Sequence, residues 1–139
     1  MRPEALNALR GSHLILHAGD LGSSAVLDSL AAIAPTIAVR GNVDGPWAKD
    51  IPENVVTNVG EIAIYMLHDL SRLDIKPEAG GFRVVISGHS HKPHQERKKG
   101  VLYFNPGSAG PRRFSLPVSV GRLTINAEEI QCELITLDV

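Results

Sequence analysis

The sequence has little cysteine, almost no net charge and no long apolar run. Cys132 is the only cysteine among 139 residues, which excludes an internal disulfide. Fourteen Lys and Arg residues oppose fifteen Asp and Glu residues, and a formal charge of −1 gives no reason to expect a nucleic-acid partner. No apolar run approaches the roughly 20 residues that span a bilayer, so no membrane partner is expected either. The first residues read as neither a signal nor a transit peptide. We therefore expect a cytoplasmic protein.

The length and the apolar content predict a single domain over residues 1–139. A chain of this size with 43% hydrophobic residues buries one core and is too short for two ordinary domains. Apolar spacing predicts helices over 3–10 and from Ser23 or Ser24 up to Pro35. The strands that we predict cover 13–17, 36–39, 55–59, 62–67, 83–87, 93–97, 101–104, 118–125 and 130–137. Early strands alternate with helices and late ones with hairpins, which favours a mixed α/β sandwich.

Polar side chains follow the predicted buried strands at several places. They are Asp20, Asn42, His68, His89 and His91, each directly or a few residues beyond a strand end. In α/β sheets that edge is where ligand sites assemble. Glycines at positions 19, 41 and 88 allow tight turns just before them. The pattern therefore predicts that distant segments bring these side chains to one rim.

The side chains at this rim are suitable metal ligands. Asp20 has two oxygens and can bridge two cations, Asn42 offers an amide oxygen, and the three histidines offer ring nitrogens. A mixed nitrogen and oxygen set suits Mn, Fe, Ni, Co or Zn better than Ca or Mg. Each residue also has an ordinary explanation: Asp20 and Asn42 are common turn formers, and His68 can cap a strand. His89 and His91 together are harder to explain structurally.

Read in order, these segments resemble the successive motifs of calcineurin-like metallophosphoesterases. The closer resemblance is to the small phosphodiesterases of the YfcE and MJ0936 type. The segments that carry it are His17-Ala18-Gly19-Asp20, Gly41-Asn42-Val43-Asp44, His68-Asp69, Gly88-His89-Ser90-His91, and Asn105-Pro106-Gly107-Ser108 with Pro111-Arg112.

The resemblance implies an αββα sandwich of two mixed β-sheets flanked by helices, with a two-metal site. In that site Asp20 would bridge the ions, while Asn42, His68 and His89 would complete one ion and His91 would bind the other. The implied reaction is hydrolysis of a small phosphate ester by a metal-activated hydroxide, with Asp20, Asn42 and His89 as catalytic residues. Manganese is the favoured metal, with Ni, Fe, Co and Zn as alternatives.

Two arginines are candidate contacts for the substrate. Arg40 precedes the Asn42 motif and either meets the substrate phosphate or is an ordinary solvated arginine. Arg112 either lines the site or anchors its loop.

The sequence departs from the family at its start. The family opens with a strand that ends in Asp-x-His-Gly and supplies two ligands, and the sequence begins after that point. We therefore expect one metal position with four ligands, and a second with only Asp20 and His91. A missing central strand would also expose a sheet edge, so homo-oligomers are expected if the chain folds alone. The alternative function is an impaired phosphoesterase-fold scaffold, or a metal-binding protein, that acts through protein interactions.

Overall fold

The computed structural model describes residues 2–41, 44–110 and 116–137. The helical elements are α1 (Pro3–Leu9), α2 (Ser24–Ala31) and the 3₁₀ turns η1 (Pro46–Ala48) and η2 (Leu70–Arg72). The strands are β1 (Ile15–His17), β2 (Thr36–Ala38), β3 (Asn54–Val59), β4 (Ile62–Leu67), β5 (Phe82–Ile86), β6 (His94–Lys98), β7 (Val101–Asn105), β8 (Ser119–Asn126) and β9 (Glu129–Thr136). Every predicted helix and strand is present, with its ends moved by at most a few residues. The two 3₁₀ turns were not predicted.

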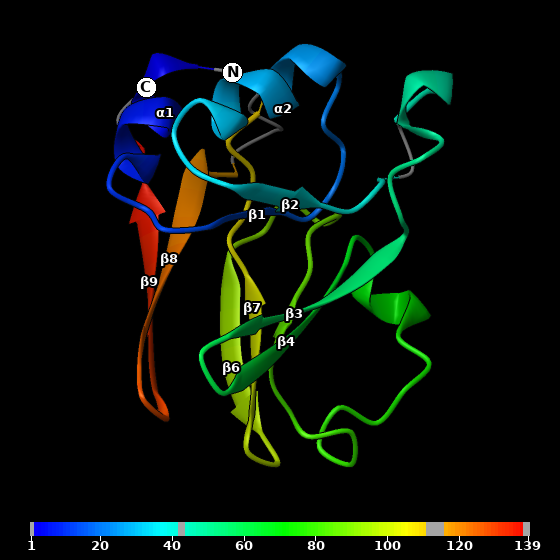
Figure 1. The fold of residues 1–139 in the computed structure, drawn as a ribbon, viewed down its shortest axis with the longest axis vertical. Coiled ribbons are helices and arrows are strands. Elements are labelled where there is room, and N and C mark those ends of the chain that lie inside the picture. The colour runs from blue at the N-terminus through cyan, green and yellow to red at the C-terminus, as the bar shows by residue number, and fades with distance from the viewer. Residues whose placement is uncertain (1, 42–43, 111–115, 138–139) are drawn as a thin grey trace.

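One sheet of five strands, here called the central sheet, runs in the order β3-β4-β5-β7-β6. Its middle strands β4, β5 and β7 are parallel, and β3 and β6 are added at the edges as antiparallel hairpin partners. The small sheets β1–β2, which is parallel, and β8–β9, which is antiparallel, pack against one face of it (Figure 1). The α/β sandwich expected from the sequence is confirmed. The described strands of its second layer, however, form two separate pairs, and only the central sheet is mixed.

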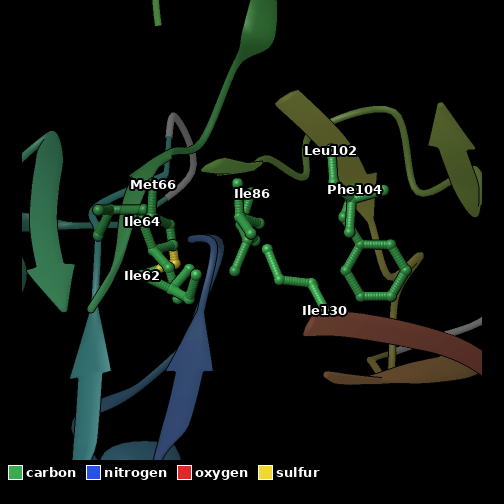
Figure 2. Packing of buried hydrophobic residues seen from close by; sticks show 9 residues of the cluster. Ile62, Ile64, Met66, Ile86, Leu102, Phe104 and Ile130 are labelled. Carbon is green, nitrogen blue, oxygen red and sulfur yellow. The ribbon is translucent and has the colours of Figure 1, made fainter. Parts of the chain in front are cut away.

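The main core lies between the central sheet and the two small sheets. Side chains alternate along a strand, so Ile62, Ile64 and Met66 of β4 all point to this interface. Figure 2 shows them beside Ile86 and near Ile130, which reaches in from β9. Parallel strands buried on both faces need continuous apolar runs, and β4, β5 and β7 have such runs.

Helices cover only the outer side of the small sheets. Leu6 of α1 and Leu30 of α2 pack around Ile15 of β1. On the opposite face of the central sheet, Leu73 packs against Tyr65. Among the described residues that outer layer is η2 and the loop after it, rather than the α-helices that an αββα sandwich implies. The loop 74–81 contains Pro and Gly, which disfavour a helix there. No helix in the described ranges is long and apolar enough to cross a bilayer.

The core predicts a contrast between two apolar residues of the β3–β4 hairpin, one on each strand. Ile64 is 1% exposed and Val56 is 57% exposed. Ile64→Ala should lower the free energy of unfolding by about 2–5 kcal/mol, because it leaves a cavity. Val56→Ala should cost less than about 1 kcal/mol. Urea unfolding of both variants checks this, and equal losses would contradict the packing described.

Candidate metal centre

The carboxyl ends of strands from two layers meet at one edge of the sandwich. The ring nitrogen Nδ1 of His68, just beyond β4, lies 2.7 Å from the carbonyl oxygen of Ala18, just beyond β1. The backbone N–H of Gly88, beyond β5, donates to the carbonyl of His68 at 2.9 Å. The loops that follow β1, β4 and β5 are therefore joined directly, as the pattern of polar residues after strand ends predicted.

Glycine makes this close approach possible. Gly19 has φ of 105°, and a Cβ there would lie 2.6 Å from His68 Nδ1 and 2.9 Å from the Cα of Gly41. A Cβ at Gly41 would overlap the carboxylate of Asp20. The backbone segments are packed so tightly that a side chain at either position would push the neighbouring polar groups apart.

His68 lies at the centre of the site and is only 7% exposed. Its Nε2 lies 3.2 Å from Oδ2 of Asp20 and 3.3 Å from Nδ1 of His89. The two rings meet edge to face, with centroids 5.1 Å apart. Because Nδ1 of His68 faces a carbonyl oxygen, we assign its proton to Nδ1. The lone pair on Nε2 then faces Asp20 and His89.

These donors suit a divalent transition metal. Two ligands about 2.1 Å from an ion, at an angle of about 90–110°, lie about 3.0–3.4 Å apart, and both distances from His68 Nε2 fall in that range. The carboxylate and imidazole donors have the predicted chemistry. Within the described ranges no three His, Cys, Asp or Glu side chains form a complete metal-binding group. The predicted ligand Asn42 lies outside the described residues, so the donors seen here are a partial set centred on His68.

Three of the predicted site residues have strained backbone conformations. Asp20, His89 and His91 have φ of 58°, 69° and 60°, in the left-handed region that non-glycine residues seldom adopt. The other two such residues in the described ranges, Lys99 and Ala127, lie at hairpin turns, where this conformation is ordinary. His91 follows His89 by two residues in the same loop and is partly exposed. Strain of this kind concentrates at functional sites.

Two further side chains hold the loop that carries Asp20. Nδ1 of His17 accepts the backbone N–H of Gly19 at 3.2 Å. Burial lowers the pKa of His17, although the carboxylates of Asp44 and Asp20 act in the opposite direction. Asp44 accepts the backbone N–H groups of Gly22 and Gly41, at 3.1 and 2.9 Å. His17 and Asp44 therefore stabilise the loops around the site.

The loop that carries His89 is held by a residue to which the sequence assigned no role. The side-chain amide of Asn105, at the end of β7, donates to the carbonyl of Gly88 and to the hydroxyl of Ser90, both at 3.1 Å. Its oxygen accepts the backbone N–H of Gly107 at 2.9 Å. Asn105 was quoted as part of a motif, but the hydrogen bonds that define its role join segments far apart in sequence.

A cavity of about 600 Å³ opens beside His68 and His89. Its wall includes Arg40, Glu53, Asp69 and Arg72. The guanidinium of Arg40 lies 2.8 Å from Glu53 Oε1 and donates to the carbonyl of Lys49, so it is held in place at the wall. The second predicted substrate contact, Arg112, lies outside the described residues. Asp69 and Arg72 come from η2 and its cap, and because this turn was not predicted, the sequence assigned no role to either residue.

Comparison with known proteins identifies the family. Residues 1–128 match the model of the calcineurin-like phosphoesterase superfamily domain. The chain belongs to this superfamily. A probable metallophosphoesterase from Methanothermobacter thermautotrophicus is 33% identical over 141 aligned residues, which cover 96% of this chain and 81% of that protein. The predicted resemblance to calcineurin-like phosphoesterases is thereby confirmed.

Solved structures share the fold of this phosphoesterase chain. An archaeal phosphodiesterase superposes with a TM-score of 0.76 at 24% identity, covering 95% of this chain and 90% of that one. Vps29 of Chaetomium thermophilum superposes with a TM-score of 0.75 at 20% identity, covering 98% and 88%. At these identities the likeness establishes the fold alone, which therefore occurs both in a phosphodiesterase and in Vps29.

A second glycine with a positive φ serves as the control for the close approach at Gly19. Gly22 has φ of 85° and nothing within 4 Å of its Cβ position. Gly22→Ala should therefore lower the free energy of unfolding only by the cost of a positive φ in alanine, about 1–2 kcal/mol. Gly19→Ala should cost about 1–3 kcal/mol more, because its methyl group meets His68 and Gly41. Urea unfolding measures both, and a Gly19→Ala loss no larger than that of Gly22→Ala would show that the loops are loosely packed.

Proposed function

We propose that the chain is a metal-dependent phosphoesterase that hydrolyses a small phosphate ester. The observation that carries the proposal is the cluster in which His68 Nε2 faces both Asp20 and His89 at the carboxyl ends of the strands. Membership of the phosphoesterase superfamily supports phosphoester hydrolysis as the reaction. Together they favour a hydrolase over a pure binding module.

In this proposal Asp20, His68 and His89 hold one divalent ion, with Asn42 as its fourth ligand and His91 directed to a second ion. When bound, such an ion supplies Lewis acidity at the phosphoryl oxygen and lowers the pKa of a bound water. The hydrogen bond from His68 Nδ1 to Ala18 fixes the ring, so that Nε2 rather than Nδ1 serves as the ligand. The donor set favours manganese, with Ni, Fe, Co or Zn as alternatives.

The cavity supports a substrate larger than a bare phosphate group. It continues from His68 and His89 to Tyr65 and Arg72 along the wall. Among the described residues the guanidinium of Arg72 lies within 4.0 Å of no carboxylate, whereas Arg40 is paired with Glu53. Arg72 is therefore the cation available to a leaving group that carries its own negative charge, and Arg40 is the proposed contact of the reacting phosphate.

Hydrolysis of an activated aryl phosphodiester with and without Mn²⁺ tests the proposed reaction. We expect Mn²⁺-dependent turnover, and a loss of about 100-fold or more in His89→Ala, because even groups that only orient ligands typically cost 10–100-fold. His94→Ala is the matched control, since His94 has 58% of its side chain exposed and pairs with Glu96. It should retain wild-type activity.

Two outcomes would overturn the proposal. One is turnover that is the same with and without Mn²⁺ and is unchanged in His89→Ala, and the other is no turnover at all with Mn²⁺ present. The second outcome with tight, stoichiometric metal binding would favour a metal-binding protein. Without metal binding it would favour the scaffold that acts through protein contacts.

The role proposed for Arg72 predicts a substrate-dependent effect. For an aryl phosphodiester whose leaving group carries a carboxylate, Arg72→Ala should raise KM about 10-fold, corresponding to one charge-assisted hydrogen bond of about 1.4 kcal/mol. With a neutral leaving group KM should hardly change. Arg83→Ala removes the same charge from a partly exposed position on β5 and serves as the control. Equal effects of Arg72→Ala on both substrates would contradict the role.

A further inference from the structure

Asp69 lies between the end of β4 and the ring of His89. One carboxylate oxygen, Oδ1, accepts the backbone N–H of Ser71 at 3.0 Å and its hydroxyl at 2.8 Å. The other oxygen, Oδ2, is directed toward His89 and lies 4.0 Å from its Nε2. Capping η2 therefore uses only one side of the carboxylate, and the same contacts fix the direction of the other side.

The two nitrogens of the His89 ring face opposite partners. Nδ1 lies 3.3 Å from Nε2 of His68, and Nε2 faces the Asp69 carboxylate. Nδ1 of His68 is already committed to the carbonyl of Ala18. The gap between His68 Nε2 and His89 Nδ1 therefore holds either a proton, carried by one of the two rings, or a cation, because two lone pairs repel at that distance.

A carboxylate near Nε2 favours the tautomer with the proton on that nitrogen. That tautomer leaves Nδ1 of His89 without a proton, on the side where His68 and Asp20 converge. Pairing of a ligand histidine with a carboxylate through its other nitrogen is a general way to set the orientation and basicity of the ring. The contact is longer than a hydrogen bond, so its effect here is electrostatic.

We propose that Asp69 is a positioning residue for His89, which keeps the proton of that ring on Nε2 and so presents Nδ1 to a divalent cation. This inference rests on the proposed function, because it assigns His89 as a ligand. It gives a role to a residue that the sequence analysis quoted within a motif but to which it assigned no function. The position of Asp69 depends on Ser71, which extends the chain of contacts from η2 to Asp20.

Asp69→Asn is the informative variant, because it keeps the shape of the side chain. Oδ1 can still accept from Ser71, and the amide group then turns N–H donors toward His89 Nε2, which disfavours a proton there. In the metal-free protein we expect the fraction of His89 with its proton on Nε2, measured from ring ¹⁵N chemical shifts, to fall. We expect calorimetric affinity for Mn²⁺ or Zn²⁺ to fall about 10–100-fold. Asp50→Asn removes the same charge from an exposed position and should change neither quantity.

Ser71→Ala provides a second variant that keeps the carboxylate but removes one of its anchors, and it should weaken metal binding in the same direction by a smaller factor.

Unchanged His89 shifts and unchanged metal affinity in Asp69→Asn, with backbone spectra intact, would overturn the proposal. If the wild-type chain binds metal and turns over substrate, that result removes only the role of Asp69. If the wild-type chain binds no metal, the proposed function fails, and the metal-free ¹⁵N shifts still decide whether Asp69 orients His89.

Discussion

The site depends on one partly buried hydrogen bond, between His68 Nδ1 and the carbonyl of Ala18. His68 extends from the central sheet and Ala18 follows a strand of the other layer, so the bond joins the two layers at the edge where the strands end. It also decides which ring nitrogen of His68 faces Asp20 and His89. Gly19 is required because a side chain there would meet Nδ1 of His68, and Gly41 because a side chain there would overlap Asp20.

Much of the fold was predictable, because the signals for it are local. The continuous apolar run 62–67 and the turn signals between strands mark the elements directly in the sequence. The pairing of strands is not local, and neither the division of the second layer into β1–β2 and β8–β9 nor the coil over the outer face of the central sheet was predicted. The turn η2 has only three residues and no periodic signal.

The candidate site was predictable to the same extent. From the rule that ligands gather beyond strand ends, the sequence predicted that Asp20, His68 and His89 lie close together. In the structure Asp20 and His89 both contact His68. Asp69 and Asn105 contact segments remote in sequence, and Arg72 lies on the unpredicted turn η2, so no spacing rule could indicate roles for them. Metal binding and the second ion stay predictions, and the predicted ligand Asn42 lies outside the described residues.

The left-handed backbone conformations of Asp20 and His89 link the local order of this edge to the binding of a ligand there. Each such residue stores about 1–3 kcal/mol relative to a relaxed loop. A cation held by both side chains would offset that cost only while the loops keep their shape, so occupancy and local order form a single equilibrium. The buried cluster around Ile64 and Met66 contains no residue in this conformation, so this link between backbone strain and a ligand is absent there.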